Sequence, residues 1–272
     1  MTLDATETIG PTPAMSGDPF GEDPSVQRVL TPLWRELFFP FDWMALRASP
    51  VYFGCGVARG KGEPVLIVPG FLGNDDYLVE MYGWLQRIGY RPYFSQIGVN
   101  ADCPDHLARV LLDTVRRARA ETGFKPVLIG HSLGGMLARS VAIEYPGEVS
   151  GVVVLGSPFK DTVRAHPVII AAADALRRSR GRSPIGRNIG PSCFSGHCTC
   201  TFVRTMIAPG QIAVPHYSIY SKTDGVVDWT SCREDDPELN TEVTATHIGM
   251  AFHPGVYRTL ARRLAEIRDL SE

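Results

Sequence analysis

The chain has 272 residues, of which 44% are hydrophobic and 21% are charged, and its formal net charge is −2. A chain of this length and composition can bury a sizeable core, and α/β folds of this size often form a single domain. The near-neutral charge gives no electrostatic reason to expect nucleic acid or an anionic membrane as a partner.

The first 25 residues are polar and rich in Pro, Gly and Thr, which predicts a loosely ordered tail at residues 1–25 and one domain at residues 26–272. No basic region followed by an apolar stretch occurs here, so no secretory signal is expected. Uninterrupted apolar runs also fall short of the roughly 18 residues of a membrane-spanning helix. The expected location is the cytoplasm, or the outside of the cell if a leader has been removed.

Short apolar segments alternate with helical patterns through the middle of the chain. Strands are predicted at residues 64–71, 91–96, 126–130 and 151–158. Helices are predicted between them, at residues 74–89, 104–123 and 134–144. Fully apolar strands separated by helices are typical of a mostly parallel sheet covered by helices on both faces, which is the fold class that we predict.

The alternating pattern stops at residues 159–215 and then resumes. This stretch holds one apolar helix candidate, at residues 168–176, followed by an irregular run of Gly, Pro, Arg and Cys. Strands are expected again at residues 216–221 and 241–245, and a helix at residues 254–270 closes the chain. An excursion of this length within a regular α/β series predicts a lid or cap insertion. Its apolar helix either covers an apolar site beneath the cap or packs against the sheet, and an exposed apolar face would allow contact with a lipid interface.

Six cysteines leave three interpretations open. Three of them crowd together with His197 in the segment "CFSGHCTC": Cys193, Cys198 and Cys200. The other three are scattered: Cys55, Cys103 and Cys232. Disulfides that staple the cap, free buried thiols and a metal site are all compatible with this pattern, and Cys55 could also pair with Cys103.

The segment Gly130–Gly134, "GHSLG", matches the pattern G-x-S-x-G and lies between a predicted strand and a predicted helix. This is the context of a nucleophile elbow, a sharp turn that lifts a serine hydroxyl out of the sheet at the start of a helix. Side chains two residues before and after the serine would collide with neighbouring backbone, and glycine removes that collision. Ser132 is therefore the predicted nucleophile.

A serine nucleophile needs a histidine base and an acid that orients the base. Asp224 lies in a turn directly after the strand at residues 216–221, and His247 lies directly after the strand at residues 241–245. We predict that these two residues complete a Ser132–His247–Asp224 triad. Asp228 is the competing acid. Its alternative role is that of a surface carboxylate or a helix cap.

Two other histidines lie close to the predicted site in the sequence. His253 is the competing base, but it precedes Pro254 and is expected at the start of a helix, while His131 is expected to pack beside the site. An oxyanion formed during acyl transfer can be stabilised by two backbone N–H groups. The expected donors are Leu133, which follows the serine, and Phe71, in the loop "VPGFLGND" after the first apolar strand.

Together, the loop "PGFLG", the elbow "GHSLGG" and the segments "LGSPF", "SKTDGVVDW" and "THIGM" resemble the α/β-hydrolase superfamily, in particular its bacterial lipase- and esterase-like members. The resemblance covers about residues 62–270. It implies an α/β-hydrolase fold, and a triad that cleaves carboxylic esters through an acyl-enzyme without a metal or an organic cofactor. It also implies a small ester substrate with a hydrophobic acyl or aromatic group. One departure is Pro69–Gly70 in the oxyanion loop, where many members carry His-Gly.

The leading hypothesis is therefore a serine esterase or lipase. An acyltransferase or thioesterase would use the same triad, with another alcohol in place of water or a thioester in place of the ester. A non-catalytic binding module of the same fold is the third hypothesis, which the presence of nucleophile, acid, base and oxyanion positions in order disfavours.

Overall fold

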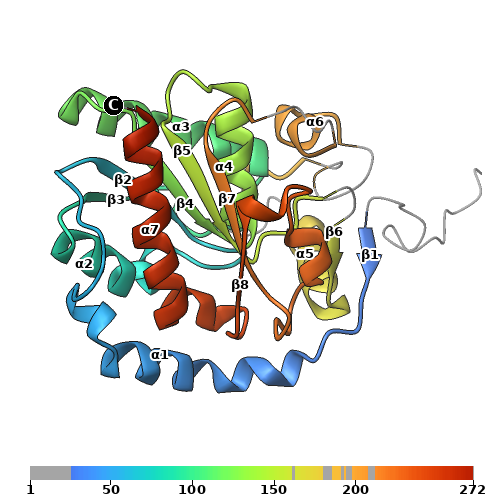
Figure 1. The fold of residues 1–272 in the computed structure, drawn as a ribbon. Coiled ribbons are helices and arrows are strands. Elements are labelled where there is room, and N and C mark those ends of the chain that lie inside the picture. The colour runs from blue at the N-terminus through green and yellow to red at the C-terminus, as the bar shows by residue number, and fades with distance from the viewer. Residues whose placement is uncertain are drawn as a thin grey trace, which may run out of the picture.

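A six-stranded parallel sheet forms the centre of the structure, in the strand order β3-β2-β4-β5-β7-β8 (Figure 1). The computed structural model describes residues 26–160, 163–179, 186–190, 193, 198–207 and 212–271, so the predicted tail lies outside the described residues. The strands in sheet order are β3 (Arg91–Phe94), β2 (Pro64–Val68), β4 (Val127–His131), β5 (Gly151–Leu155), β7 (His216–Ser221) and β8 (Asn240–Val243). The predicted parallel α/β fold is thereby confirmed.

Helices cover both faces of this sheet, and successive strand residues point to opposite faces. Val65 and Ile67 of β2 pack with α2 (Val79–Arg87) and α7 (Pro254–Ser271), whereas Leu66 and Val68 pack with α3 (Pro104–Thr122) and α4 (Leu133–Glu144). Every residue of β2, β4 and β5 is buried. These strands therefore appear in the sequence as continuous apolar runs, because both of their faces lie in a core.

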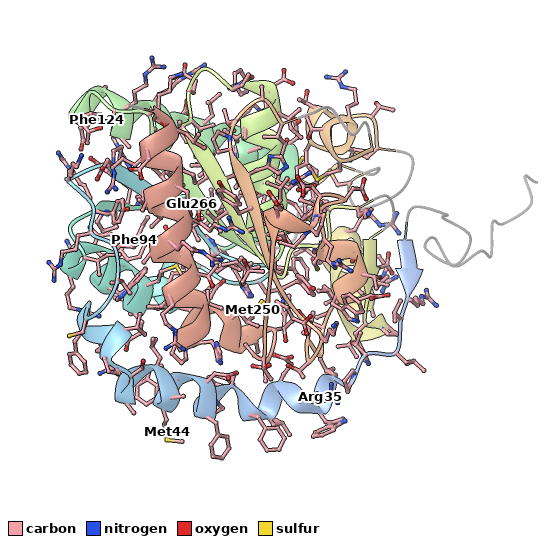
Figure 2. All side chains as sticks on the ribbon, in the orientation of Figure 1. Arg35, Met44, Phe94, Phe124, Met250 and Glu266 are labelled. Carbon is pink, nitrogen blue, oxygen red and sulfur yellow. The ribbon has the colours of Figure 1, made fainter. Side chains whose placement is uncertain are left out.

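An N-terminal arm lies along the outer edge of the molecule, where no element is predicted from the sequence. It consists of the 3-10 helix η1 (Leu33–Phe38) and the helix α1 (Phe39–Ala48), and the short turn η2 (Pro50–Phe53) leads on towards β2. Only Glu36 and Leu46 of this arm are buried. Met44 is seen projecting away from the body of the protein in Figure 2. Apolar residues occupy the outer as well as the inner side of the arm, so its sequence has no amphipathic period to detect.

The excursion at residues 159–215 is described in part. It contains β6 (Val163–Ala165), α5 (Pro167–Arg178) and α6 (Thr201–Ile207), and β6 pairs in parallel with β1 (Val26–Arg28). α5 is the predicted apolar helix. Its first turn begins at His166, whose side chain accepts a hydrogen bond from the N–H of Val168. Within the described ranges, no helix is both long and apolar enough to cross a membrane.

All six cysteines are free thiols in this structure. Cys103 lies at the N-terminus of α3, and its side-chain partner is Cys193. The hydrogen bond between these two thiols lowers the pKa of the Cys103 thiol to about 6. Among the residues that the structure describes, no group of three or more His, Cys, Asp or Glu side chains could hold a metal ion. His197, the remaining member of the cluster considered for zinc, lies outside the described residues.

Candidate active site

Ser132 lies in the turn between β4 and α4 with a backbone φ of 52° and ψ of −124°. A non-glycine residue with positive φ is under backbone strain, and such strain persists where the surrounding structure enforces it. The N–H of Ser132 is held by the carbonyl of Leu155 at 2.8 Å, which anchors the turn to β5. The strand–turn–helix geometry is that of the elbow expected from "GHSLG".

The glycines on either side of Ser132 have no room for a side chain. A Cβ built on Gly130 would lie 2.4 Å from the carbonyl oxygen of Gly134, and one built on Gly134 would lie 2.3 Å from the carbonyl oxygen of Pro69. These obstacles are backbone atoms, which cannot rotate away as a flexible side chain would.

We predict that Gly134→Ala destabilises the fold by about 1–3 kcal/mol or more, because overpacking against backbone forces the main chain to move. Urea denaturation of the variant beside the wild type measures this loss. Gly147→Ala is the matched control, because a Cβ on Gly147 would meet nothing within 4 Å. Equal stability of the two variants would contradict the prediction.

Asp224 and His247 form a buried pair at the carboxyl ends of β7 and β8. The Nδ1 atom of His247 lies 2.6 Å from Oδ2 of Asp224, and each residue is about 5% exposed. The other oxygen of Asp224, Oδ1, accepts hydrogen bonds from the N–H groups of Val226 and Val227 at 2.8 and 2.9 Å. Both oxygens of Asp224 are thus used, and its orientation toward the imidazole is fixed.

The two competing residues of the sequence interpretation occupy other roles. Asp228 caps the 3-10 turn η4 (Trp229–Cys232), where its side chain accepts hydrogen bonds from the N–H and hydroxyl of Thr230. His253 precedes α7, and its Nδ1 accepts the N–H of Gly255.

The pKa of His247 reflects opposing effects. Burial lowers the pKa of this imidazole, but the charge and hydrogen bond of Asp224, with a further contribution from the charge of Glu36, outweigh it and raise the pKa above its ordinary value. A carboxylate that stabilises the imidazolium in this way favours proton acceptance by His247.

A pH profile follows from this shift. In the triad predicted from the sequence, His247 is the general base, which must be neutral to accept a proton. For the ester hydrolysis that the sequence predicts, kcat/KM should therefore fall as the pH decreases through the pKa of His247. We expect the inflection to lie above the ordinary imidazole value of about 6.5. Rates measured from about pH 5 to pH 9 test this expectation, and an inflection below the ordinary value would contradict it.

His131, which precedes the serine, connects the loop after β2 to the backbone of His247. The N–H of Gly70 donates to the hydroxyl of Tyr77 at 2.9 Å, and this hydroxyl lies 2.8 Å from Nδ1 of His131. Nε2 of His131 lies 2.9 Å from the carbonyl oxygen of His247. Burial, with a smaller effect of the neighbouring His247, lowers the pKa of His131 to about 3, so the ring is neutral. A neutral ring satisfies both contacts in one tautomer, in which Nε2–H donates to the carbonyl and Nδ1 accepts the Tyr77 hydroxyl.

The loop that carries Phe71 packs directly against Ser132. A Cβ built on Gly70 would lie 3.2 Å from Cβ of Ser132. Buried Asn100 supports this loop, because its Nδ2 donates to the carbonyl of Pro69 at 2.8 Å. Leu133 is the first residue of α4, a position whose N–H has no acceptor within the helix. The two predicted oxyanion donors thus lie on segments that flank the serine.

Two carboxylates of the N-terminal arm hold the loops that carry the acid and the histidine, and nothing in the sequence signals them. One oxygen of Glu36 accepts the N–H groups of Gly225 and His247, and the other accepts the N–H of Ile248, each at 2.9 Å. Asp42 accepts the N–H and the hydroxyl of Thr246 at 3.1 and 2.9 Å. Sequence separations of about 200 residues leave no local pattern from which these contacts could be inferred.

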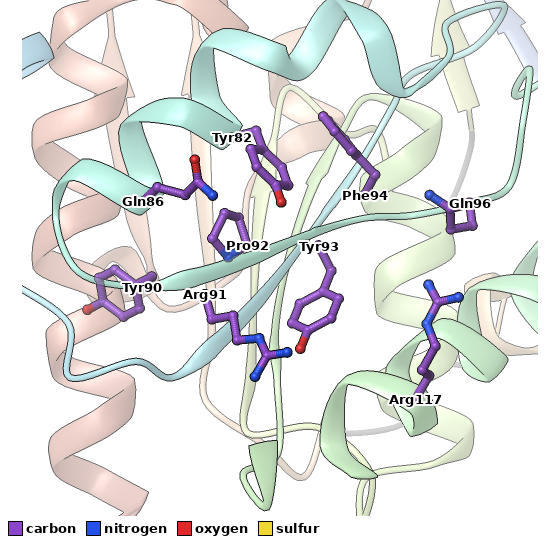
Figure 3. Close-up of a pocket in the computed structure, with 9 residues that line it drawn as sticks. All are labelled: Tyr82, Gln86, Tyr90, Arg91, Pro92, Tyr93, Phe94, Gln96 and Arg117. Atoms are coloured by element: carbon purple, nitrogen blue, oxygen red, sulfur yellow. The ribbon is translucent and has the colours of Figure 1, made fainter. Parts of the chain in front are cut away.

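A hollow of about 420 Å³ lies elsewhere, at the edge of the sheet beside β3 (Figure 3). Aromatic side chains with two arginines form much of its wall, among them Tyr82, Tyr93, Arg91 and Arg117. None of Ser132, Asp224 and His247 lines this hollow, so it is separate from the candidate active site.

Comparison with known proteins agrees with this architecture. Residues 63–179 match the family model of the alpha/beta hydrolase fold. A triacylglycerol lipase of Burkholderia plantarii is 31% identical over 126 residues, which are 43% of this chain and 35% of the relative. A triacylglycerol lipase of Pseudarthrobacter phenanthrenivorans is 34% identical over 106 residues, which are 36% of this chain and 33% of the relative. The matched segment thus spans about a third of the length of these relatives.

Solved structures share the fold over most of the chain. The crystal structure of a metagenomic carboxyl esterase superposes with a TM-score of 0.57 and 14% identity, covering 89% of this chain and 93% of the esterase. A structure from the metagenome-derived lipolytic enzymes LipS and LipT gives a TM-score of 0.53 and 16% identity, covering 78% and 96% of the two chains. The parallel sheet and these matches define an α/β-hydrolase-fold protein. Over part of its length the chain is similar to the two triacylglycerol lipases, and its fold is similar to that of the carboxyl esterase.

Proposed function

We propose that this protein hydrolyses carboxylic esters through an acyl-enzyme, with Ser132 as nucleophile, His247 as general base and Asp224 as the acid that orients the base. The buried 2.6 Å contact between His247 and Asp224, at the same edge of the sheet as the serine elbow, carries this proposal. A carboxylate bound to Nδ1 holds the imidazole in the tautomer whose Nε2 can accept the serine proton.

The proposed reaction has two halves. Ser132 Oγ attacks the ester carbonyl while His247 takes its proton, and the N–H groups of Phe71 and Leu133 stabilise the resulting oxyanion. The alcohol leaves with the proton from His247, and the acyl group stays on Ser132. Water then attacks the acyl-enzyme, with its proton passing to His247, and the carboxylic acid is released as Ser132 recovers its proton.

The excursion at residues 159–215 is proposed to cap the acyl side of this site. Its described part joins the turn that carries Asp224: the N–H of His166 donates to the carbonyl of Val226 at 2.8 Å, and Ala165 bridges to Val227. A cap attached there would border the site from the carboxyl end of β7. The curated relatives are named triacylglycerol lipases, which favours substrates with hydrophobic acyl groups.

Hydrolysis of p-nitrophenyl esters from acetate to palmitate tests the proposal. We expect turnover with a preference for medium or long acyl chains, because an apolar acyl group gains free energy on leaving water, by about 0.8 kcal/mol per buried CH₂. A preference for acetate would assign an esterase with a small acyl site. Absence of turnover at every chain length, in folded protein, would contradict ester hydrolysis, and an added alcohol acceptor would then test acyl transfer.

A further inference from the structure

The outer face of the N-terminal arm is strongly apolar. Five large side chains within eleven residues are each about half or more exposed: Trp34 61%, Leu37 78%, Phe38 48%, Phe41 61% and Met44 49%. Phe39 and Trp43 are also exposed. We call these seven residues the arm face. Single exposed apolar side chains are normal on a soluble protein, but a contiguous run of this size marks a surface that contacts something other than water.

The charges of the arm are sorted between its two sides. Both of its carboxylates, Glu36 and Asp42, point inward and bind backbone N–H groups of the loops after β7 and β8. Of its two arginines, Arg35 lies beside an exposed ring, with its guanidinium 5.8 Å from the ring centre of Trp34. Arg47 lies 4.9 Å from Trp43 but is paired with Glu80. The outer side thus combines aromatic rings with the cation of Arg35, while the anions of the arm are turned away.

This combination fits a lipid surface. Trp and Phe rings settle at the boundary between headgroups and acyl chains, and an arginine beside them, as Arg35 is here, can bind a headgroup phosphate. We propose that the arm face docks onto a lipid surface and brings the active site to substrate held there. This inference rests on the proposed ester hydrolysis, since a hydrophobic ester collects at such a surface. The same arm binds the His247 loop from its inner side, so docking through it would bring that loop close to the lipid.

Vesicle co-sedimentation tests the docking surface. The probes are phosphatidylcholine vesicles with and without phosphatidylglycerol, and the protein carries Ser132→Ala so that binding is read without turnover. We expect Trp34→Gln combined with Phe41→Gln and Met44→Gln to weaken vesicle binding by about tenfold or more. Phe124→Gln is the matched control, because Phe124 is 59% exposed but lies on the turn between α3 and β4 (Figure 2). This control should bind as the parent does.

Two results would overturn the proposal. One is equal vesicle binding by the parent and the triple variant, or no binding by either. The other is a parent that elutes as a dimer and a triple variant that elutes as a monomer, which would make the arm face an interface between two copies. A second assay separates the two proposals: hydrolysis of a water-soluble acetate ester by the wild type and by the triple variant, both with Ser132 present. Absence of hydrolysis by the wild type would contradict ester hydrolysis, whereas vesicle binding is measured independently of hydrolysis.

A different observation, the hydrogen bonds of Glu36, carries a second inference. This carboxylate is buried and accepts three backbone N–H groups, from Gly225 beside the acid and from His247 and Ile248. A single side chain therefore ties the acid loop to the histidine loop across two strands. We infer that Glu36 is a positioning residue that sets the alignment of Asp224 with His247.

The side chains around His247 allow a specific test of this role. His247 faces Asp224 through its Nδ1, Glu36 through its backbone N–H and the neutral ring of His131 at a centroid distance of 4.8 Å, while Asp42 binds the preceding residue. Glu36→Gln removes one charge from this set and replaces one acceptor oxygen with a donor. We expect kcat for a soluble ester to fall about tenfold or more with KM little changed, and the acid limb of the pH profile to move to lower pH.

Glu80→Gln is the matched control, because Glu80 binds Arg47 of the arm and Tyr52 rather than the His247 loop. It should leave both kcat and the pH limb unchanged. Glu36→Asp keeps the charge but shortens the side chain, so it should lower kcat without moving the limb, and it serves if Glu36→Gln does not fold. Wild-type kcat in folded Glu36→Gln and Glu36→Asp, or a lower kcat of Glu36→Gln with an unmoved limb, would overturn the inference.

Discussion

Replacing Ser132 with alanine should lower kcat/KM for p-nitrophenyl esters by several orders of magnitude, about 10⁴-fold or more, and leave the fold intact. The hydroxyl is the only group at the elbow from which an acyl-enzyme could form in the proposed mechanism. Alanine removes it without adding bulk to the tight turn, whose neighbouring glycines leave no space. The measurement is initial ester hydrolysis, with the thermal unfolding transition as a check on folding.

Ser150→Ala is the matched control for this experiment. Ser150 precedes β5, and its hydroxyl donates to the carbonyl of Lys125. Its loss should leave ester turnover unchanged. If the Ser132 variant hydrolyses esters at the wild-type rate, the proposed acyl-enzyme at this position is wrong, whatever the activity of the protein.

The second large effect is expected at the acid. Asp224→Asn should lower kcat/KM by about 10⁴-fold, because an amide in place of the carboxylate no longer stabilises the imidazolium and favours the wrong tautomer of His247. The carboxylate raises the pKa of His247, so the residual activity should also show its acid limb at lower pH. Ester hydrolysis across the pH range measures both effects.

Asp228→Asn provides the comparison. Asp228 caps η4 through Thr230, so its amide variant should keep ester turnover near the wild-type rate and cost about 1 kcal/mol of stability or less. The opposite order of the two variants would assign the acid role to Asp228 and contradict the triad proposed here.

Several parts of the candidate site are recognisable in local sequence because local geometry demands particular residues. The elbow requires glycine at positions 130 and 134, where a Cβ would meet backbone at 2.3 to 2.5 Å, so the pattern around Ser132 is visible without a structure. Asp224 and His247 are predicted from the sequence because parallel strands end at the same edge of the sheet. The choice between Asp224 and Asp228 depends on distances, and four residues of separation could not settle it.

Other parts had no detectable signal. In the sequence, Tyr77 occupies one apolar position of the helix predicted at residues 74–89. In the structure, its hydroxyl links Gly70 to His131. Within the excursion at residues 159–215, the apolar helix α5 is predictable from the sequence. The attachment of the excursion to the turn after β7 is not, because it depends on how the chain returns to the sheet.

By itself, the sequence determined the parallel sheet with helices on both faces, the serine turn and the positions of the proposed acid and histidine. Burial on two faces and a strained turn each restrict residue type over a few neighbouring positions. Only the tertiary structure decided how these positions are held. Glu36 and Asp42 reach loops about 200 residues away, His131 bridges the loops after β2 and β8, and the arm keeps its aromatic rings outside. The contacts of Glu36 and Asp42 join backbone N–H groups, which every residue but proline carries, to carboxylates, which are common on any surface. Such pairs become specific only when the folded chain brings them within hydrogen-bonding distance.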